Sequence, residues 1–420
     1  MNCILLKEYG RKCFVGFAYG LPFPLTLAIL GFWLKDAGVS NTVIGAFSLF
    51  HWPFVFKFVW GAFIENCDVP HLTKRIGRNR SWVMVGYLIL VVGIVGMSFS
   101  DPQSSLLQLM LFASLAALGD GCKDVALYPY QIDGTTTKNH LGYVASVVGF
   151  GQKIGMIIAK VGVMYLAYFF SWKTAYLLAA AAIFIQMIMI FFLKAPPEQH
   201  DENEFSGKSL KLLLQDSIKK SLAVPFCNMM KKKETSHLII IILFYKSIDF
   251  MMQNMSRVFL MEIGFSKIEI ANVQLLGAIV VIIGGLASGY IIKKIGLARS
   301  VVYFGAAHAL SFSFYTILLN TGTVPSILNS IILFEAFTGG CVTTAFVATF
   351  YTACKTGSMY ALLWALHEAS GIFFMGISGI VVDNIGWNNY FRLIPLIYLI
   401  LMLCWCRTIA KGSFTMQTSN

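Results

Sequence analysis

The chain of 420 residues is 57% hydrophobic and only 12% charged, and its mean hydropathy is +0.72. A soluble domain has roughly a quarter of its residues charged, so a water-soluble fold is excluded because the polar side chains are too few to cover the apolar ones. The net charge of +12 could indicate nucleic-acid binding, but we expect no nucleic-acid partner, because the positions of the basic residues have another explanation, given below.

Apolar runs long enough to cross a bilayer recur along the whole sequence. The first set lies at 13–34, 42–64, 81–100, 105–129, 140–169 and 172–193. The second set lies at 238–262, 267–292, 299–318, 326–352, 358–382 and 387–409. The runs lack the strict alternation of barrel strands, so they predict helices. The sequence therefore predicts an all-α membrane protein of about twelve transmembrane helices.

A polar stretch with an acidic patch and three consecutive lysines separates the two sets of apolar runs. It is too polar to cross a bilayer. It predicts an N-terminal six-helix half at 1–194, a cytoplasmic linker at 195–236 and a C-terminal six-helix half at 237–420. This arrangement is typical of the major facilitator superfamily, in which two similar halves enclose the substrate site.

The basic residues predict the orientation of the spans. With both termini in the cytoplasm, the cytoplasmic segments hold 22 Lys and Arg, whereas the opposite loops hold only Lys35, Lys173 and Lys267. Cytoplasmic loops carry the excess of Lys and Arg in membrane proteins. The positive charge therefore indicates a multi-pass protein of the cell inner membrane with cytoplasmic termini.

The sequence shows no pattern of metal or cofactor ligands. Its nine cysteines are scattered without a CxxC pair, as are its seven histidines, so we expect structural cysteines, no metal and no cofactor. The first apolar run continues to Leu34 without a cleavage site for a signal peptidase, and we expect it to remain as a helix.

Several stretches of the first half carry a resemblance to a known family. They are Gly20-Leu21-Pro22, Phe32-Trp33-Leu34-Lys35-Asp36-Ala37-Gly38, Trp52-Pro53-Phe54, Ile76-Gly77-Arg78-Asn79-Arg80-Ser81-Trp82, Gly119-Asp120-Gly121-Cys122-Lys123-Asp124-Val125-Ala126 and Gly151-Gln152-Lys153-Ile154-Gly155-Met156. Through them the chain resembles the AmpG-like muropeptide permeases of the major facilitator superfamily, and the related acetyl-CoA transporters. The resemblance covers residues 16–195 well and the second half only generally. Glu65-Asn66 depart from it where the family has an Asp-Arg type pair.

The resemblance implies a secondary active, proton-coupled transporter that imports peptidoglycan-derived anhydromuropeptides from periplasm to cytoplasm by alternating access. We expect a monomer whose partners are an anionic sugar-peptide, protons and the lipid bilayer. Transport of acetyl-CoA or another anionic metabolite is the alternative, and the sequence leaves both open. An intramembrane enzyme is disfavoured because no HExxH or GxSxG motif occurs, and no P-loop indicates direct use of ATP.

Ionisable residues inside the predicted spans are the candidate site residues, because each costs about 2.5–3.5 kcal/mol at the centre of a bilayer. On the span at 238–262, Lys246, Asp249, Gln253 and Arg257 follow the spacing i, i+3, i+7 and i+11, which predicts one polar stripe. The predicted substrate and proton pathway comprises Asp120, Lys123, Asp124, Lys153, Lys160, Lys246, Asp249, Gln253, Arg257, Glu335, Trp364, His367 and Glu368. Ion pairs that only stabilise the helix bundle are the alternative interpretation.

Roles within this pathway follow from charge. A buried carboxyl that changes partners can carry the coupled proton, and the candidates are Asp124, Asp249, Glu335 and the pair His367-Glu368. Lys153 and Lys246 are predicted to bind an anionic group of the substrate. Trp364 could stack on a sugar ring or simply pack.

A second group of charged residues lies at the predicted cytoplasmic ends of the spans. Arg78 and Arg80 are predicted to bridge to Glu65 and Asp133 and so to close the cytoplasmic face. Ordinary solvated charges are the alternative.

Overall fold

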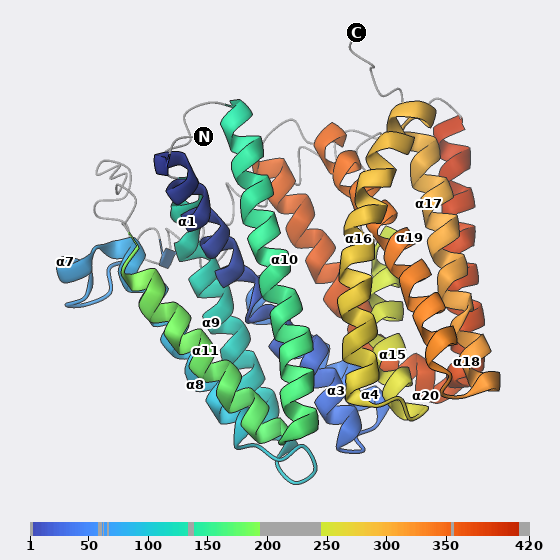
Figure 1. Cartoon of the computed structure of the whole chain (residues 1–420), viewed down its shortest axis with the longest axis horizontal. Coiled ribbons are helices and arrows are strands. Elements are labelled where there is room, and N and C mark those ends of the chain that lie inside the picture. The colour runs from blue at the N-terminus through green and yellow to red at the C-terminus, as the bar shows by residue number, and fades with distance from the viewer. Residues whose placement is uncertain are drawn as a thin grey trace. The chain divides into compact units, whose positions relative to one another are not determined.

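A computed structural model describes residues 3–57, 61, 63–64, 67–132, 138–193, 245–353 and 357–410, and every regular element in these residues is a helix (Figure 1). The chain divides into two compact units. Unit 1 is Met1–Val39 with Phe50–Lys219, and unit 2 is Ser40–Leu49 with Lys220–Asn420. The predicted linker at 195–236 lies outside the described residues, so the boundaries of the two halves stay a prediction.

Unit 1 consists of long helices and several short ones. They are α1 (Cys3–Gly20), α2 (Phe23–Thr26), α3 (Ala28–Asp36), α5 (Trp52–Val55), α7 (Thr73–Ile76), α8 (Arg78–Ser98), α9 (Leu106–Ile132), α10 (Lys138–Phe169) and α11 (Trp172–Phe191). Within the unit α8 packs on α9 and α11, and α1 packs on α10. These contacts place the polar residues of α9 next to α1 and α8.

Unit 2 also consists of long helices and a few short ones. Its elements are α4 (Asn41–Phe47), α15 (Ser247–Glu262), α16 (Lys267–Ile295), α17 (Leu297–Ser313), α18 (Tyr315–Thr321), α19 (Pro325–Ala353) and α20 (Gly357–Ala410). The chain turns inside α20 at Gly386, whose φ of 74° is one that glycine adopts without strain. The two spans predicted at 358–382 and 387–409 are therefore separate helices on either side of Gly386. Within the unit α19 packs on α16 and α17, and α15 packs on α20.

Two predicted spans are broken in the structure. Within the run at 13–34, α1 ends at Gly20 and α3 begins at Ala28. The short helix α2 lies between them, and Leu27 has a non-helical conformation. The prolines at 22 and 24 have no backbone N–H to donate to the preceding turn, which explains the break. The run at 42–64 is likewise divided by a short 3₁₀ turn at Ser48–His51 before Pro53. The two breaks bring Thr26 Oγ1 within 3.3 Å of His51 Nδ1.

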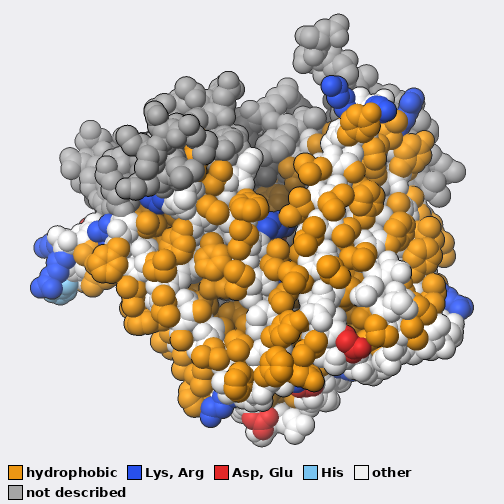
Figure 2. Space-filling view, viewed as in Figure 1, with side chains coloured by type: hydrophobic (Ala, Val, Ile, Leu, Met, Phe, Trp, Pro, Cys, Tyr) orange, Lys and Arg blue, Asp and Glu red, His pale blue; other side chains and the backbone are white. Residues whose placement is uncertain are grey.

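The membrane character of the fold is clear from the described helices. Nine helical stretches of the described residues are long and apolar enough to cross a membrane, and one of them, Leu363–Met402, contains the turn at Gly386. The predicted spans at 42–64 and 238–262 are only partly described. On the visible flank of each unit hydrophobic side chains dominate, while most Lys and Arg side chains lie near helix ends (Figure 2). The prediction of an all-α membrane protein is confirmed.

Glycines allow α1 and α10 to pack backbone against backbone. A Cβ built on Gly151 of α10 would overlap the carbonyl oxygen of Cys13, and one built on Gly20 of α1 would overlap that of Gln152. Small residues at such crossings let membrane helices approach closely and gain dispersion energy. Gly149, two residues earlier on α10, has no atom within 4 Å of the corresponding position.

Gly151 and Gly149 together give a direct test of the α1–α10 contact. We expect Gly151→Ala to destabilise the protein by about 1–3 kcal/mol, because the added methyl group must separate two backbones. Gly149→Ala, the matched control, is expected to leave stability unchanged or raise it by about 0.5–1 kcal/mol through helix propensity. Thermal unfolding of the purified variants in detergent measures both effects, and equal melting temperatures would contradict the packing seen here.

Candidate functional site

Unit 1 contains a buried triad of charges on α9. The side chains of Asp120, Lys123 and Asp124 are almost wholly enclosed, with 1%, 0% and 8% of each residue exposed. Lys123 Nζ lies 2.6 Å from Asp120 Oδ1 and 3.2 Å from Asp124 Oδ1. It also donates a hydrogen bond of 2.8 Å to the carbonyl of Ala18 on α1. When all three groups are ionised, two carboxylates share one ammonium, and the triad has one negative charge in excess.

The surroundings of the triad explain how it is held. A Cβ on Gly86 of α8 would lie 2.6 Å from the backbone nitrogen of Lys123, so α8 and α9 touch at this level. The rings of Tyr19 and Tyr87 face the ammonium, with their centroids 5.8 and 5.6 Å from Nζ. Aromatic faces attract a cation at such distances. Tyr19 Oη also donates to the backbone oxygen of Asp124 at 2.6 Å.

Lys12 is a second buried lysine of unit 1, and it lies directly before the first predicted span, in the N-terminal segment whose basic residues were counted as cytoplasmic. Its side chain is 0% exposed, lies 3.7 Å from Glu8 and donates to the carbonyl of Gln131 at 3.0 Å. It therefore ties α1 to the end of α9. The i, i+4 spacing of Glu8 and Lys12 was the signal that could have indicated a paired charge rather than a solvated one.

The two predicted lysines of α10 differ from Lys123. Lys153 is exposed and Lys160 is half-buried. The structure pairs Asp124 with Lys123. The roles predicted for Lys153 and Lys160 stay predictions.

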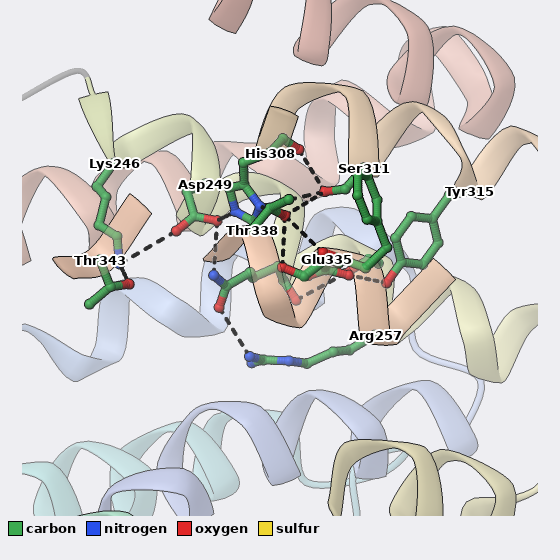
Figure 3. Close-up of polar contacts among 12 residues, drawn as sticks. Lys246, Asp249, Arg257, His308, Ser311, Tyr315, Glu335, Thr338 and Thr343 are labelled. Carbon is green, nitrogen blue, oxygen red and sulfur yellow. Dashed lines mark hydrogen bonds and ion pairs between the residues drawn. The ribbon is translucent and has the colours of Figure 1, made fainter. Parts of the chain in front are cut away.

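Unit 2 contains a buried network centred on Asp249 of α15, which is 3% exposed (Figure 3). Its Oδ1 lies 2.9 Å from His308 Nε2 of α17 and accepts a hydrogen bond of 2.9 Å from Gln253 Nε2. Its Oδ2 lies 3.7 Å from Lys246 Nζ. Lys246 Nζ in turn donates to Thr343 Oγ1 of α19 at 2.8 Å. The predicted stripe on α15 is therefore in place, and it is joined to two other helices.

The network continues beyond Asp249 toward Glu335 of α19. Gln253 Oε1 accepts a hydrogen bond of 3.4 Å from Arg257 Nη2, so Gln253 links Arg257 to Asp249. Tyr315 of α18 donates from Oη to Glu335 Oε2 at 2.5 Å. In Figure 3 these side chains form one row from Lys246 to Tyr315, with His308 near its middle. The network brings together Lys246, Asp249, Gln253, Arg257 and Glu335, and their role as a substrate and proton pathway stays a prediction.

The three predicted residues of α20 lie in or beside a group of rings. His367 is 3% exposed, and its ring centroid lies 5.2 Å from Phe250, 4.6 Å from Phe346 and 5.8 Å from Trp364. Trp364 and Glu368 are half-buried. Trp364 therefore packs against His367, and its stacking on a sugar stays a prediction.

The predicted cytoplasmic gate is described only in part. Glu65 and Asp133 lie outside the residues whose placement is described, so their bridges to arginine stay a prediction. Arg78 forms an ion pair of 2.9 Å with Asp68. Arg80 donates to the carbonyl of Leu193 at 2.6 Å, and its guanidinium lies 5.4 Å from the ring centroid of Phe191.

The polar partners that other helices supply were not predicted from the sequence. They are His308 and Ser311 of α17, Tyr315 of α18, and Thr338 and Thr343 of α19. His308, Ser311 and Tyr315 follow the spacing i, i+3 and i+7, the same signal that identified the stripe on α15. Among the residues described, no three His, Cys, Asp or Glu side chains come together as ligands for a metal.

Comparison with known sequences and structures places this geometry in context. The profile of the Major Facilitator Superfamily matches residues 13–374. "Putative transporter AmpG 3" of Rickettsia prowazekii (strain Madrid E) is 27% identical over 387 residues, which is 90% of this chain and 90% of that protein. "Anhydromuropeptide permease" of Escherichia coli (strain K12) is 25% identical over 383 residues, which is 90% of this chain and 74% of that protein.

Solved structures share the fold at low sequence identity. A POT family transporter in complex with 5-aminolevulinic acid has a TM-score of 0.71 and 14% identity, and the match covers 96% of each chain. A mutant of the nucleoside transporter NupG has a TM-score of 0.68 and 12% identity, with 97% of this chain and 100% of that chain covered. At these identities the likeness establishes the fold alone.

Proposed function

This chain belongs to the Major Facilitator Superfamily, and we propose that it is a secondary active transporter that imports anhydromuropeptides. The proposal is supported by similarity to AmpG-like permeases, including the anhydromuropeptide permease of Escherichia coli, along most of both chains. Polar networks buried within both units also support a transporter, because charges inside a membrane protein are costly and mark substrate and ion pathways.

A proton gradient is the proposed driving force, and the triad on α9 is the observation that carries this part of the proposal. Asp120 and Asp124 share Lys123 as their common cation while being almost wholly buried. The three charges of the triad leave one negative charge in excess, with Lys57 as a further cation that acts on both carboxylates. Binding one proton neutralises the excess within the triad. The triad therefore offers a place where a proton is bound in one state of the transport cycle and released in another.

The proposed substrate is a sugar-peptide with a free carboxylate, and Lys246 is its proposed anchor. The side chain of Lys246 is 14% exposed, in contrast to 3% for its partner Asp249. An acyl-CoA or another phosphate-bearing metabolite is the second candidate, because a lysine binds a phosphate as readily as a carboxylate. Lys153 on α10 is proposed to contribute a second cation.

The proposed location is the inner membrane, with both termini in the cytoplasm. The support is the distribution of basic residues, with 22 Lys and Arg in the segments assigned to the cytoplasm and three in the opposite loops.

Uptake by proteoliposomes tests the function. We expect purified protein to accumulate labelled N-acetylglucosaminyl-anhydro-N-acetylmuramyl peptide when the outside is acidic, and a protonophore to abolish accumulation. Labelled acetyl-CoA in the same vesicles is the comparison substrate. Accumulation of acetyl-CoA alone would favour the second candidate, and accumulation that survives the protonophore would exclude proton coupling.

A further inference from the structure

His308 is a buried ionisable group of unit 2 that the proposed function does not use. It is 1% exposed and lies on α17, with its two ring nitrogens facing two different helices. Nε2 lies 2.9 Å from Asp249 Oδ1 of α15, and Nδ1 lies 2.9 Å from Thr338 Oγ1 of α19 (Figure 3). Ser311 Oγ lies 3.4 Å from the same Nδ1.

The partners of His308 can satisfy the ring in both of its protonation states. An ionised carboxylate accepts hydrogen bonds only, so Asp249 requires a hydrogen on Nε2. A hydroxyl can donate or accept. Thr338 Oγ1 can give its hydrogen to Nδ1, or to the carbonyls of Phe334 and Glu335, each 3.0 Å away. A neutral imidazole and an imidazolium are therefore both fully hydrogen-bonded, with rotation of one hydroxyl as the only change.

The charges that face His308 decide which state is populated. The titratable and charged groups of the network that contains His308 and Asp249 are Lys246, Arg257, Tyr245, Tyr315, Glu335, His367 and Tyr398. With Lys246 and Arg257 positive and Asp249 and Glu335 negative, these groups cancel. A proton on His308 would then add an unbalanced buried charge, which is costly. A neutral ring leaves this network without net charge while the site is empty.

An incoming anion changes this balance. Lys246 lies 3.7 Å from Asp249, longer than the roughly 2.7–2.9 Å of a charge-assisted hydrogen bond, and it is the more exposed member of the pair. A substrate carboxylate that binds Lys246 adds one negative charge to a neutral network and draws Lys246 away from Asp249. One proton on His308 then restores neutrality and gives Asp249 a new cationic partner.

We propose that His308 takes up one proton when the anionic group of the substrate binds Lys246, so that unit 2 binds anion and proton together. This inference rests on the proposed function, which supplies the anionic substrate. The proton adds to Nδ1, the Nε2–H bond to Asp249 persists, and Thr338 turns from donor to acceptor. Linkage is reciprocal, so the proton strengthens anion binding by the same factor by which the anion strengthens proton binding. His308 thus acts through Asp249 and Lys246, as a proton-binding residue that need not touch the substrate.

Proton uptake on substrate binding tests this inference. Titration calorimetry of the purified transporter with the anhydromuropeptide, in two buffers of different ionisation enthalpy, gives the number of protons bound per substrate. We expect His308→Gln to bind one proton fewer than the wild type, because the amide can keep a donor on Asp249 but cannot take up a proton. The substrate affinity of His308→Gln should also vary less with pH than that of the wild type. The difference is up to about tenfold in affinity per pH unit.

Three further variants separate the proposal from a structural role. Thr338→Val combined with Ser311→Ala keeps His308 but removes both hydroxyls that lie near Nδ1, and we expect its proton uptake to appear only at lower pH. His51→Gln, at another buried histidine beside a hydroxyl, is the matched control and should keep the wild-type proton number. Glu335→Gln removes one negative charge from the network, so the same balance predicts a smaller linked proton uptake there too, whereas its loss in Glu335→Gln with retention in His308→Gln would assign the proton to Glu335.

The outcomes distinguish this inference from the proposed function. In one outcome the wild type binds and transports the anhydromuropeptide, and His308→Gln binds as many protons per substrate as the wild type. That outcome overturns the role of His308 and leaves the function standing. A wild type that binds no anhydromuropeptide overturns both. If His308→Gln does not fold, an unshifted pH profile in the variant that combines Thr338→Val with Ser311→Ala overturns the inference alone.

Discussion

Lys123→Met is expected to leave little folded protein in the membrane. The substitution removes the common cation of Asp120 and Asp124 and leaves two buried carboxylates without an ammonium. Removing one partner of a buried ion pair costs about 3–5 kcal/mol, and here one lysine serves two carboxylates. Since the whole stability of a domain is about 5–15 kcal/mol, the loss is a large part of the margin. Yield and monodispersity of a fluorescent fusion on gel filtration measure the effect.

Charge balance, rather than the length of the side chain, is the expected cause of that loss. The triple variant Lys123→Met, Asp120→Asn, Asp124→Asn carries no charge at this site and is expected to recover most of the folded protein. Lys173→Met is the control, because Lys173 is an exposed lysine over the ring of Phe99. If the triple variant fails while the control folds, the hydrogen bond from Lys123 to Ala18 is the essential interaction instead. Wild-type yield of the single variant would show that the triad is not charged.

The helices were predictable from the sequence because each run of apolar residues identifies its own span. The separation of the last two spans was also predictable, since the predicted gap between 382 and 387 contains the turn at Gly386. The breaks within the first two spans were not predicted, although the prolines were visible. Hydropathy averages over a whole turn or more, and proline is tolerated in membrane helices when neighbouring groups satisfy the freed carbonyls. Composition alone therefore does not tell a kink from a break.

The site was predictable only where its residues share one helix. The spacing of Lys246, Asp249, Gln253 and Arg257 placed them on one face of α15 without any knowledge of the neighbours. The partners of this stripe come from α17 and α19, as His308 lies 59 residues and Thr343 lies 97 residues along the chain from the group it contacts. Periodicity within one helix carries no information about which other helix it faces. That choice is made by packing, through close crossings such as those of α19 with α16 and α17.

Burial of the charged residues was likewise only partly predictable. Position within an apolar run indicated that Asp120, Lys123 and Asp124 are enclosed, and all three are. Lys12 has similar surroundings in space, but it lies at the start of the first run and was assigned to the N-terminal loop. Its 0% exposure depends on the end of α9 lying against α1. The edge of a span is where sequence separates buried from solvated charges least well.

Lys246→Met is expected to fold and yet to lose most substrate binding. Asp249 keeps its contacts with His308 and Gln253 when the ammonium is removed, both at 2.9 Å, so its burial stays compensated. Loss of a hydrogen bond to a charged group costs about 1.5–3 kcal/mol, and a factor of ten in affinity corresponds to about 1.4 kcal/mol. We therefore expect the affinity for the anhydromuropeptide to fall by one to two orders of magnitude.

Binding to the purified protein by calorimetry measures this loss, and Lys246→Arg, which keeps the charge, is expected to retain most of the affinity. Lys153→Met should lose binding as well, because Lys153 is proposed as a second cation for the same anionic substrate. The contradicting result would be that Lys246→Met misfolds and that the double variant Lys246→Met, Asp249→Asn folds again. In that case the ammonium is needed to balance Asp249, and the lysine is one half of a structural ion pair. Since the same contact of 3.7 Å supports both interpretations, only the separation of folding from binding decides between them.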